Sequence, residues 1–118
     1  MLQPGKAVKI TIYLSDAAKY RGVPVYMSLL DFLFKNGVAG ASVFKGAAGF
    51  GAAHRMHSAG ILDISDGLPI KIEFVESREK VEAILEELKS RACSGMMEMQ
   101  ETTVLCAGMH SIKISDRS

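Results

Sequence analysis

Residues 6–14, KAVKITIYL, and residues 69–75, PIKIEFV, decide how this chain folds. In both stretches apolar and polar residues alternate, which is typical of strands that bury one face against a core. From Val8 onward one face of the first stretch carries only apolar residues, namely Val8, Ile10, Ile12 and Leu14. The sequence therefore predicts a sheet with one strongly apolar side.

Two helices are predicted from apolar residues that recur at helical spacing. The first covers 24–36, because Pro24 suits the first helical position and Asn36-Gly37 suits a C-terminal cap. The second starts after Ser77, a good N-cap, and ends before Gly95. Each helix thus comes after one of the two predicted strands along the chain.

The remaining segments complete the order of elements. Strands are expected over 41–46 and 96–106, with a short one at 61–64, while 47–58 is expected to be a flexible loop and 108–118 a C-terminal tail. This order predicts a single α+β domain over 1–118. Its expected architecture is a ferredoxin-like βαββαβ plait, an antiparallel four-stranded sheet with two helices on one face.

Such a plait leaves the other face of its sheet bare. The residues expected on this open face are Lys9, Thr11, Tyr13, Val43, Lys71 and Val75. A mixed polar and apolar surface of this kind usually meets a partner, and self-association into a closed ring is the common way to cover it.

Composition and charge exclude several classes of protein. The chain has 118 residues, 48% of them hydrophobic, and a net charge of +1 at pH 7, which argues against intrinsic disorder and against binding of nucleic acid. No stretch has the length of a transmembrane helix or the uninterrupted apolar core of a signal peptide. We therefore expect a cytoplasmic protein in which Cys93 and Cys106 are free thiols.

A glycine-rich run at 45–55, KGAAGFGAAHR, is the first candidate binding site. Glycines let backbone N–H groups converge on an anion, and the run is flanked by Lys45 and Arg55. It matches neither the Walker A motif nor the dinucleotide-binding fingerprint. The alternative is a flexible connection without a ligand. A second basic site, Lys19 and Arg21 before the first helix, indicates either an anionic ligand or partner or a solvated loop.

Metal binding and catalysis have weaker support. His54 and His57 are close enough in sequence to share a metal ion, but no third ligand stands at a known spacing, and two surface histidines are the alternative. Met96, Met97 and Met99 suit packing in a core or interface better than a soft copper site. A general-base role for His57 has no paired nucleophile, so the sequence predicts no enzyme.

The motifs together resemble a known family. They are RGVPVY at 21–26, GVAGASVFKG at 37–46, GFG at 49–51, RMH at 55–57, IL at 61–62 and LPIKIE at 68–73. This pattern, over about residues 5–106, resembles the domain of unknown function 190, a branch of the PII-like signalling proteins. The resemblance implies a PII-like plait that forms a homotrimer with its sheets facing inward.

The resemblance also implies a function. PII-like proteins bind adenine nucleotides in clefts between subunits and regulate partners such as a membrane transporter, so an adenine nucleotide is the candidate ligand. The PII phosphate loop is replaced here by 91–97, RACSGMM, which has one glycine and no lysine. The ligand-binding residues expected instead are Lys45, Gly46, Gly49, Gly51, Arg55 and His57. The alternative is a trimeric metal-binding plait resembling the divalent-cation tolerance proteins, in which His54 and His57 would converge with Cys106 or His110.

Overall fold

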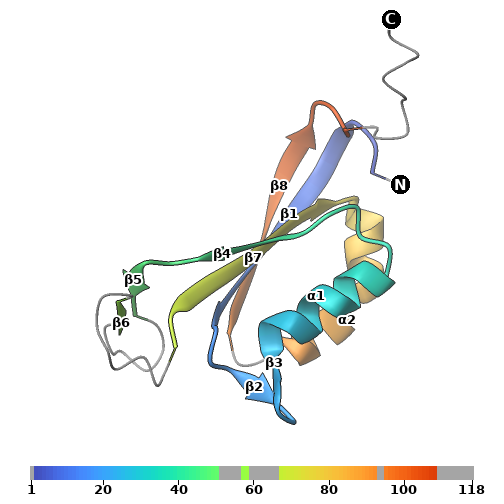
Figure 1. Ribbon diagram of the computed structural model, residues 1–118. Coiled ribbons are helices and arrows are strands. Elements are labelled where there is room, and N and C mark those ends of the chain that lie inside the picture. Colours follow the sequence, from blue (N-terminus) through green and yellow to red (C-terminus); the bar gives the residue numbers. More distant parts are fainter. Residues whose placement is uncertain (1, 51–56, 59–66, 93–94, 109–118) are drawn as a thin grey trace, which may run out of the picture.

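Four strands form one antiparallel sheet in the order β4-β7-β1-β8 (Figure 1). The computed structural model describes residues 2–50, 57–58, 67–92 and 95–108. The elements are β1 (Gly5–Ser15), β2 (Lys19–Tyr20), β3 (Val23–Pro24), α1 (Val25–Lys35), β4 (Ser42–Lys45), β5 (Ala48–Gly49), β6 (His57–Ser58), β7 (Pro69–Glu76), α2 (Arg78–Arg91) and β8 (Met96–Val104).

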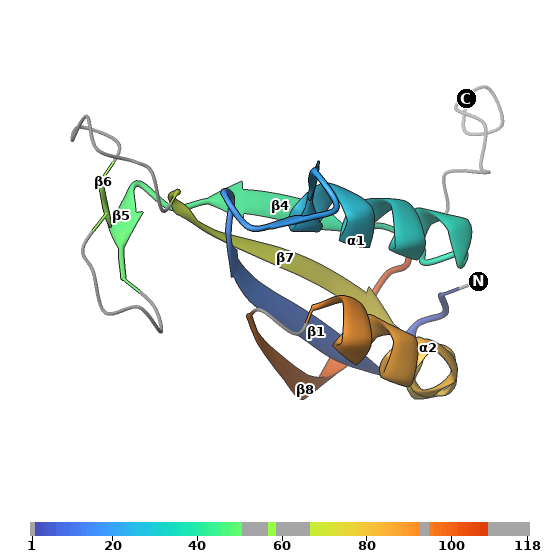
Figure 2. The ribbon, with the colours of Figure 1, turned by 90° about the horizontal axis from the view of Figure 1, so that it is seen from below.

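The core lies between the sheet and the two helices. Ile10 pairs with Phe74 and Ile12 pairs with Ile72, so the apolar positions of β1 and β7 point to the same side. These side chains are at most 3% exposed. Both helices cover this side of the sheet (Figure 2). The predicted α+β plait with two helices on one face is confirmed.

Local chemistry explains where each helix begins and ends. Ser77 caps α2 by accepting a hydrogen bond from the backbone N–H of Lys80 at 3.2 Å. At the end of α1, Gly37 has a φ of +75°, a conformation that favours glycine, and its N–H donates to the Phe34 carbonyl at 3.2 Å. The predicted helix at 24–36 is thus one residue longer than α1 at each end, while α2 begins directly after Ser77 as predicted and ends at Arg91, before Gly95.

One predicted position on the open face is wrong. Val43 pairs directly with Ile72, which places it on the helix side, where it packs against the core. Ser42 and Phe44 occupy the open face of β4 instead. Because side chains alternate along a strand, an error of one residue in the register exchanges the two faces.

Two short strands, β5 and β6, lie within the segment 47–58 that was predicted to be a loop. Ala48 pairs with Ser58, and Gly49 pairs with His57, so β5 and β6 form a separate two-stranded sheet. Residues 51–56, the predicted strand at 61–64 and the tail after residue 108 lie outside the described residues. Within the part of the chain that the structure describes, no helix is long and apolar enough to cross a membrane.

Candidate functional site

The candidate anion site begins at the end of β4. Lys45 is the last residue of this strand, and its Nζ lies 3.1 Å from Oδ2 of Asp16, which follows β1. The Lys45 side chain is 57% exposed and the Asp16 side chain is 21% exposed. An ion pair that is open to solvent is weak, so an incoming anion can compete with Asp16 for the lysine.

Asp16 also fixes the start of β7. Its backbone N–H donates to the Leu68 carbonyl at 3.0 Å, and its Oδ1 accepts from the Leu68 N–H at 2.9 Å. One carboxylate therefore ties three chain segments together through its two oxygens. Asp16 was not among the predicted site residues, because its partner Leu68 lies 52 residues further along the chain.

Glycines at this junction serve close packing. The N–H of Gly46 donates to the Pro69 carbonyl at 2.7 Å, and a Cβ on Gly46 would lie 3.0 Å from Cγ of Pro69. Gly67 has a φ of +81°, and a Cβ there would collide with Asp16 and Ser15. The N–H of Gly46 is thus already engaged, which leaves anion binding here to the lysine and to later residues of the run.

The structure places only some of the predicted ligand-binding residues. Lys45, Gly46 and Gly49 lie near the start of β7, and a Cβ on Gly49 would be 3.2 Å from Cγ of Pro69. His57 pairs with Gly49 through the backbone. Gly51 and Arg55 lie outside the described residues. The described part of the site is therefore a β-strand junction with one ion-paired lysine.

The candidate metal ligands are only partly described. His54, Cys93 and His110 lie outside the described residues, and Cys106 is an exposed free thiol. Within the described ranges, no group of three His, Cys, Asp or Glu side chains is arranged to hold a metal ion. Met97 packs against the core, as expected for a methionine on a strand that flanks it.

The open face of the sheet carries a charged cluster. Lys71 Nζ lies 2.9 Å from Oε2 of Glu73, and Lys9 Nζ lies 3.6 Å from the same oxygen. The hydrogen bond between these two side chains lowers the pKa of Glu73 below its ordinary value of 4.5 and raises the pKa of Lys71 above its ordinary value of 10.5. Lys71 also lies 5.4 Å from the ring centroid of Phe44.

Large apolar side chains on the same face remain accessible. Tyr13 is 38% exposed, Phe44 is 48% exposed and Met96 is 57% exposed. Register places Tyr13 beside Lys71 on one side and beside Met96 on the other. The open face is therefore a mixed surface of aromatic, thioether and paired charged groups.

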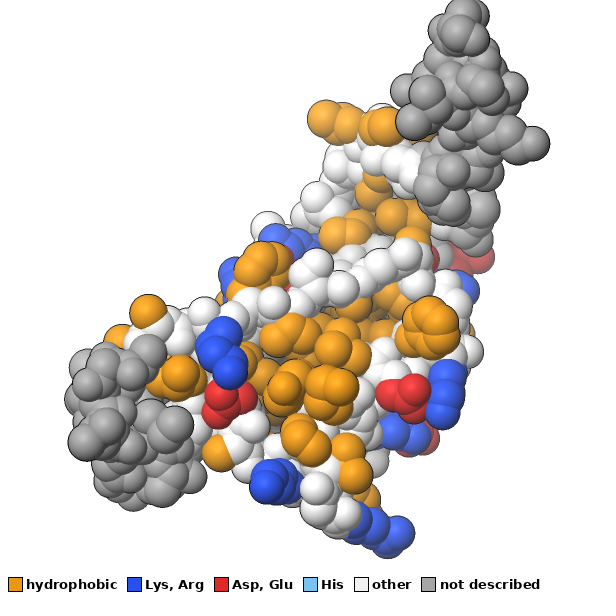
Figure 3. Space-filling model, viewed as in Figure 1, with side chains coloured by type: hydrophobic (Ala, Val, Ile, Leu, Met, Phe, Trp, Pro, Cys, Tyr) orange, Lys and Arg blue, Asp and Glu red, His pale blue; other side chains and the backbone are white. Residues whose placement is uncertain are grey.

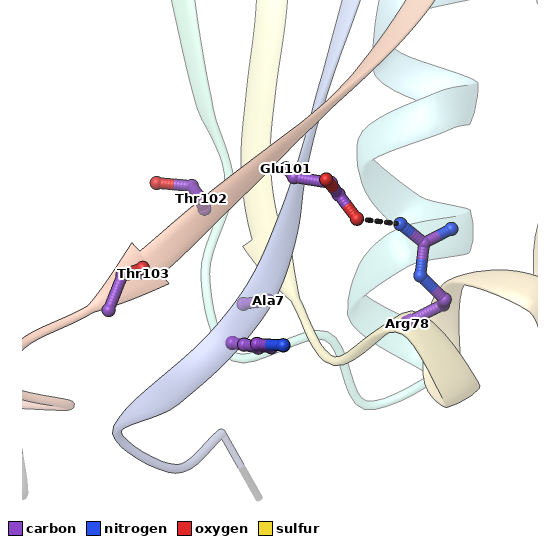
Figure 4. Close-up of a pocket in the computed structure, with 6 residues that line it drawn as sticks. Ala7, Arg78, Glu101, Thr102 and Thr103 are labelled. Carbon is purple, nitrogen blue, oxygen red and sulfur yellow. Dashed lines mark hydrogen bonds and ion pairs between the residues drawn. The ribbon is translucent and has the colours of Figure 1, made fainter.

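A cavity of about 290 Å³ lies at the other end of β1. It is lined by Lys6, Ala7, Arg78, Glu101, Thr102 and Thr103. Figure 4 shows Arg78 at the start of α2 reaching toward Glu101 of β8, and their Nη2 and Oε2 atoms are 3.1 Å apart. Both residues of this exposed ion pair line the cavity.

Comparison with known sequences gives consistent matches. The family model DUF190, described as "Uncharacterized ACR", matches residues 7–104. A UPF0166 protein of Aquifex aeolicus is 27% identical over 96 residues, covering 81% of this chain and 90% of that protein. A UPF0166 protein of Methanocaldococcus jannaschii is 32% identical over 83 residues, covering 70% of this chain and 76% of that protein.

Solved structures share the fold. CPII of Thiomonas intermedia K12, bound to ADP and bicarbonate, aligns with a TM-score of 0.61 at 24% identity, over 88% of this chain and 93% of that chain. The divalent ion tolerance protein CutA1 of Ehrlichia chaffeensis aligns with a TM-score of 0.55 at 10% identity, over 93% of this chain and 91% of that chain. The fold is therefore that of PII-like proteins.

Proposed function

This chain belongs to the DUF190 family, and on that premise we propose that it is a cytoplasmic PII-like regulator that binds a small anionic ligand of the adenine nucleotide class. The observation that carries the proposal is the shared fold with CPII, which is bound to ADP and bicarbonate. The alignment covers 88% of this chain and 93% of the CPII chain. On this reading the protein regulates a partner and has no catalytic activity of its own.

The proposed ligand site lies around the base of the 47–58 segment. The residues proposed to contact the ligand are Lys45, Gly49, Gly51, Arg55 and His57. Gly46 is proposed to contribute by holding the end of β4 in place through its hydrogen bond to the Pro69 carbonyl. Lys45 would exchange the Asp16 carboxylate for a phosphate oxygen of the ligand, because the lysine side chain is more than half exposed. In this arrangement Asp16 competes with the ligand for Lys45, which lowers the affinity for any anion that makes no further contacts.

The proposed assembly is a homotrimer whose open sheet faces meet. Lys9, Lys71 and Glu73 give the face both signs of charge, while Tyr13 and Phe44 supply apolar contact area. Such a surface is suited to contact with copies of itself. Clefts between subunits would then hold the ligand, and the proposed partner is a protein such as a membrane transporter.

A second candidate function is metal binding in a trimeric plait. The shared fold with CutA1, a divalent ion tolerance protein, favours it. The ligands would be His54 and His57 with Cys106 or His110. Metal analysis of the untagged protein tests this candidate, and the absence of bound zinc and copper after exposure to both would remove it.

Isothermal titration calorimetry tests the primary proposal. ATP, ADP, a cyclic adenine nucleotide and bicarbonate are titrated separately into protein whose oligomeric mass has been checked. We expect saturable heat from at least one adenine nucleotide. Bicarbonate should either change the affinity for that nucleotide or give a binding heat of its own. An intact trimer that gives no heat with any nucleotide would contradict the proposal.

A further inference from the structure

Helix α1 is apolar on two sides. Leu29 and Leu33 are buried against the sheet, as an amphipathic helix requires. A second apolar stripe is formed by Met27, Leu30 and Phe34, which are three and four residues apart. Met27 is 49% exposed and Phe34 is 83% exposed. This second stripe has no counterpart on α2, whose outer positions are mostly charged.

The stripe borders a groove. A hollow of about 310 Å³ lies between the last turns of α1 and the chain that leads into β4. Its lining residues are Leu30, Leu33, Phe34, Val38, Ala39, Gly40 and Ala41, none of them charged. Figure 3 shows hydrophobic side chains gathered in the middle of this face, with Lys, Arg, Asp and Glu side chains at its margins.

Polar contacts fix the chain that forms one wall of the groove. The carboxylate of Glu76, which is 2% exposed, accepts a hydrogen bond from the Ala39 N–H at 2.8 Å. Lys80 Nζ donates to the Gly37 carbonyl at 3.2 Å. Both contacts fix the chain between α1 and β4, so the wall of the groove is anchored to β7 and α2.

A basic hairpin lies at the other end of α1. Strands β2 and β3 pair, and the turn between them places Arg21 at a φ of +52° and Gly22 at +82°. Lys19 and Arg21 are exposed, and neither forms an ion pair with any described residue. The Arg21 guanidinium lies 5.2 Å from the ring centroid of Tyr20, which is 65% exposed.

We propose that the α1 groove and this hairpin together form a docking site for an amphipathic helix of a partner protein, with acidic residues in its first turn. The apolar residues of the partner helix would enter the groove at i, i+3 or i+4, and i+7. The acidic residues of its first turn would meet Lys19 and Arg21. Acidic residues in a first turn are also favoured by the dipole of the partner helix itself. The site spans the length of α1, roughly 16 Å, which matches about three helical turns.

The geometry favours this occupant over two others. The hollow of about 310 Å³ beside Phe34 is filled by the side chains of a docked helix but is left empty by a flat lipid bilayer. A second copy of the chain meets the opposite face of the sheet in the proposed trimer, which leaves α1 available. The inference rests on the proposed function only in requiring that a regulator has a partner.

A synthetic helical peptide tests the docking site. The probe is a side-chain-bridged peptide of about three turns with glutamates in its first turn and leucines at i, i+3 and i+7. Two control peptides have the same composition, one with the leucines moved off the stripe and one with lysines in the first turn. Fluorescence anisotropy with the full-length protein should show saturable binding of the probe and at least about tenfold weaker binding of both controls.

Matched variants locate the binding. Phe34→Ala should weaken probe binding by about tenfold, and Arg21→Glu should weaken it and improve binding of the lysine peptide. Leu105→Ala, at another exposed apolar residue, and Lys89→Glu, at an exposed residue of α2, should change neither. Adenine nucleotide calorimetry on Phe34→Ala should remain as in the unmodified protein, which separates failure of docking from failure of the proposed function.

Three results would overturn the docking site. The first is equal binding of the probe and both control peptides. The second is unchanged probe binding in Phe34→Ala and Arg21→Glu. The third is failure of the probe to bind while Phe34 mediates another interaction. That interaction would be binding to phosphatidylcholine–phosphatidylserine vesicles or association of trimers with each other, and it would be lost in Phe34→Ala.

Discussion

Lys45 Nζ lies 3.1 Å from Oδ2 of Asp16, so the lysine at the start of the glycine-rich run is already paired with an acid. The same carboxylate accepts a hydrogen bond from the Leu68 N–H with its other oxygen. An anionic ligand that uses Lys45 must therefore displace a carboxylate whose position is fixed by the backbone. Because of this competition, the ligand affinity of the proposed site should depend on Asp16, although Asp16 does not itself contact the ligand.

Neutralising Asp16 should strengthen nucleotide binding. Asp16→Asn keeps an oxygen for the Leu68 N–H but removes the charge that holds Lys45, so ADP affinity should rise several-fold, roughly twofold to tenfold. Lys45→Gln should lower it by a similar factor. Calorimetric titration of ADP measures both. Equal affinities in the unmodified protein and both variants would remove Lys45 from the ligand site.

Adding a methyl group at Gly95 should destabilise the fold. A Cβ there would overlap the Tyr13 carbonyl oxygen and crowd Leu14, so the start of β8 must move away from β1. We expect Gly95→Ala to lower the free energy of unfolding by about 1–3 kcal/mol. Gly40→Ala is the control, because nothing lies within 4 Å of its Cβ position. Urea unfolding followed by circular dichroism compares the two.

Glu76 should be needed as a carboxylate. It accepts hydrogen bonds from the N–H groups of Ala39 and Ser77, at 2.8 and 3.1 Å, with a different oxygen for each. Glu76→Gln replaces one acceptor by a donor, which leaves one of these two N–H groups without its charged partner and should cost about 1–3 kcal/mol. The exposed Glu98→Gln should have little effect. Hydrogen exchange at the Ala39 amide should accelerate in Glu76→Gln, and unchanged exchange would contradict this role.

The charged cluster on the open face gives a pH dependence. Because Lys71 lowers the pKa of Glu73 below 4.5, its contribution to stability is present above pH 4.5 and is lost as the pH falls through the lowered pKa. Because Glu73 raises the pKa of Lys71 above 10.5, that contribution is present below pH 10.5 and is lost as the pH rises through the raised pKa. In Lys71→Met, carboxyl-carbon NMR should report a higher pKa for Glu73. An unchanged titration of Glu73 would show that Lys71 does not act on it.

The sequence was sufficient for the four strands of the main sheet, the two helices and their order, because strict alternation at 70–74 and helical stripes at 81–88 leave little choice of structure. It failed for Val43, since β4 has only four residues and its register is set by pairing with β7. Asp16 was missed because its partner Leu68 is 52 residues away. Contacts across that distance depend on the packed sheet and leave no local pattern.

The two apolar stripes of α1 look alike in the sequence. Residues such as Met27, Leu30 and Phe34 recur at helical spacing whether they face the sheet or solvent. Only the packed structure separates the buried Leu33 from the exposed Phe34 beside it. Likewise, the sequence indicated basic residues before α1, while the hairpin that exposes them depends on the pairing of β2 with β3.

Native mass spectrometry of the protein with ADP tests the central claim most directly, because one spectrum reports both assembly and ligand. The account predicts a species of three 12.7 kDa chains that carries ADP, with binding that weakens in Lys45→Gln. A single chain at micromolar concentration, or a trimer that carries no nucleotide at saturating ADP, would contradict it.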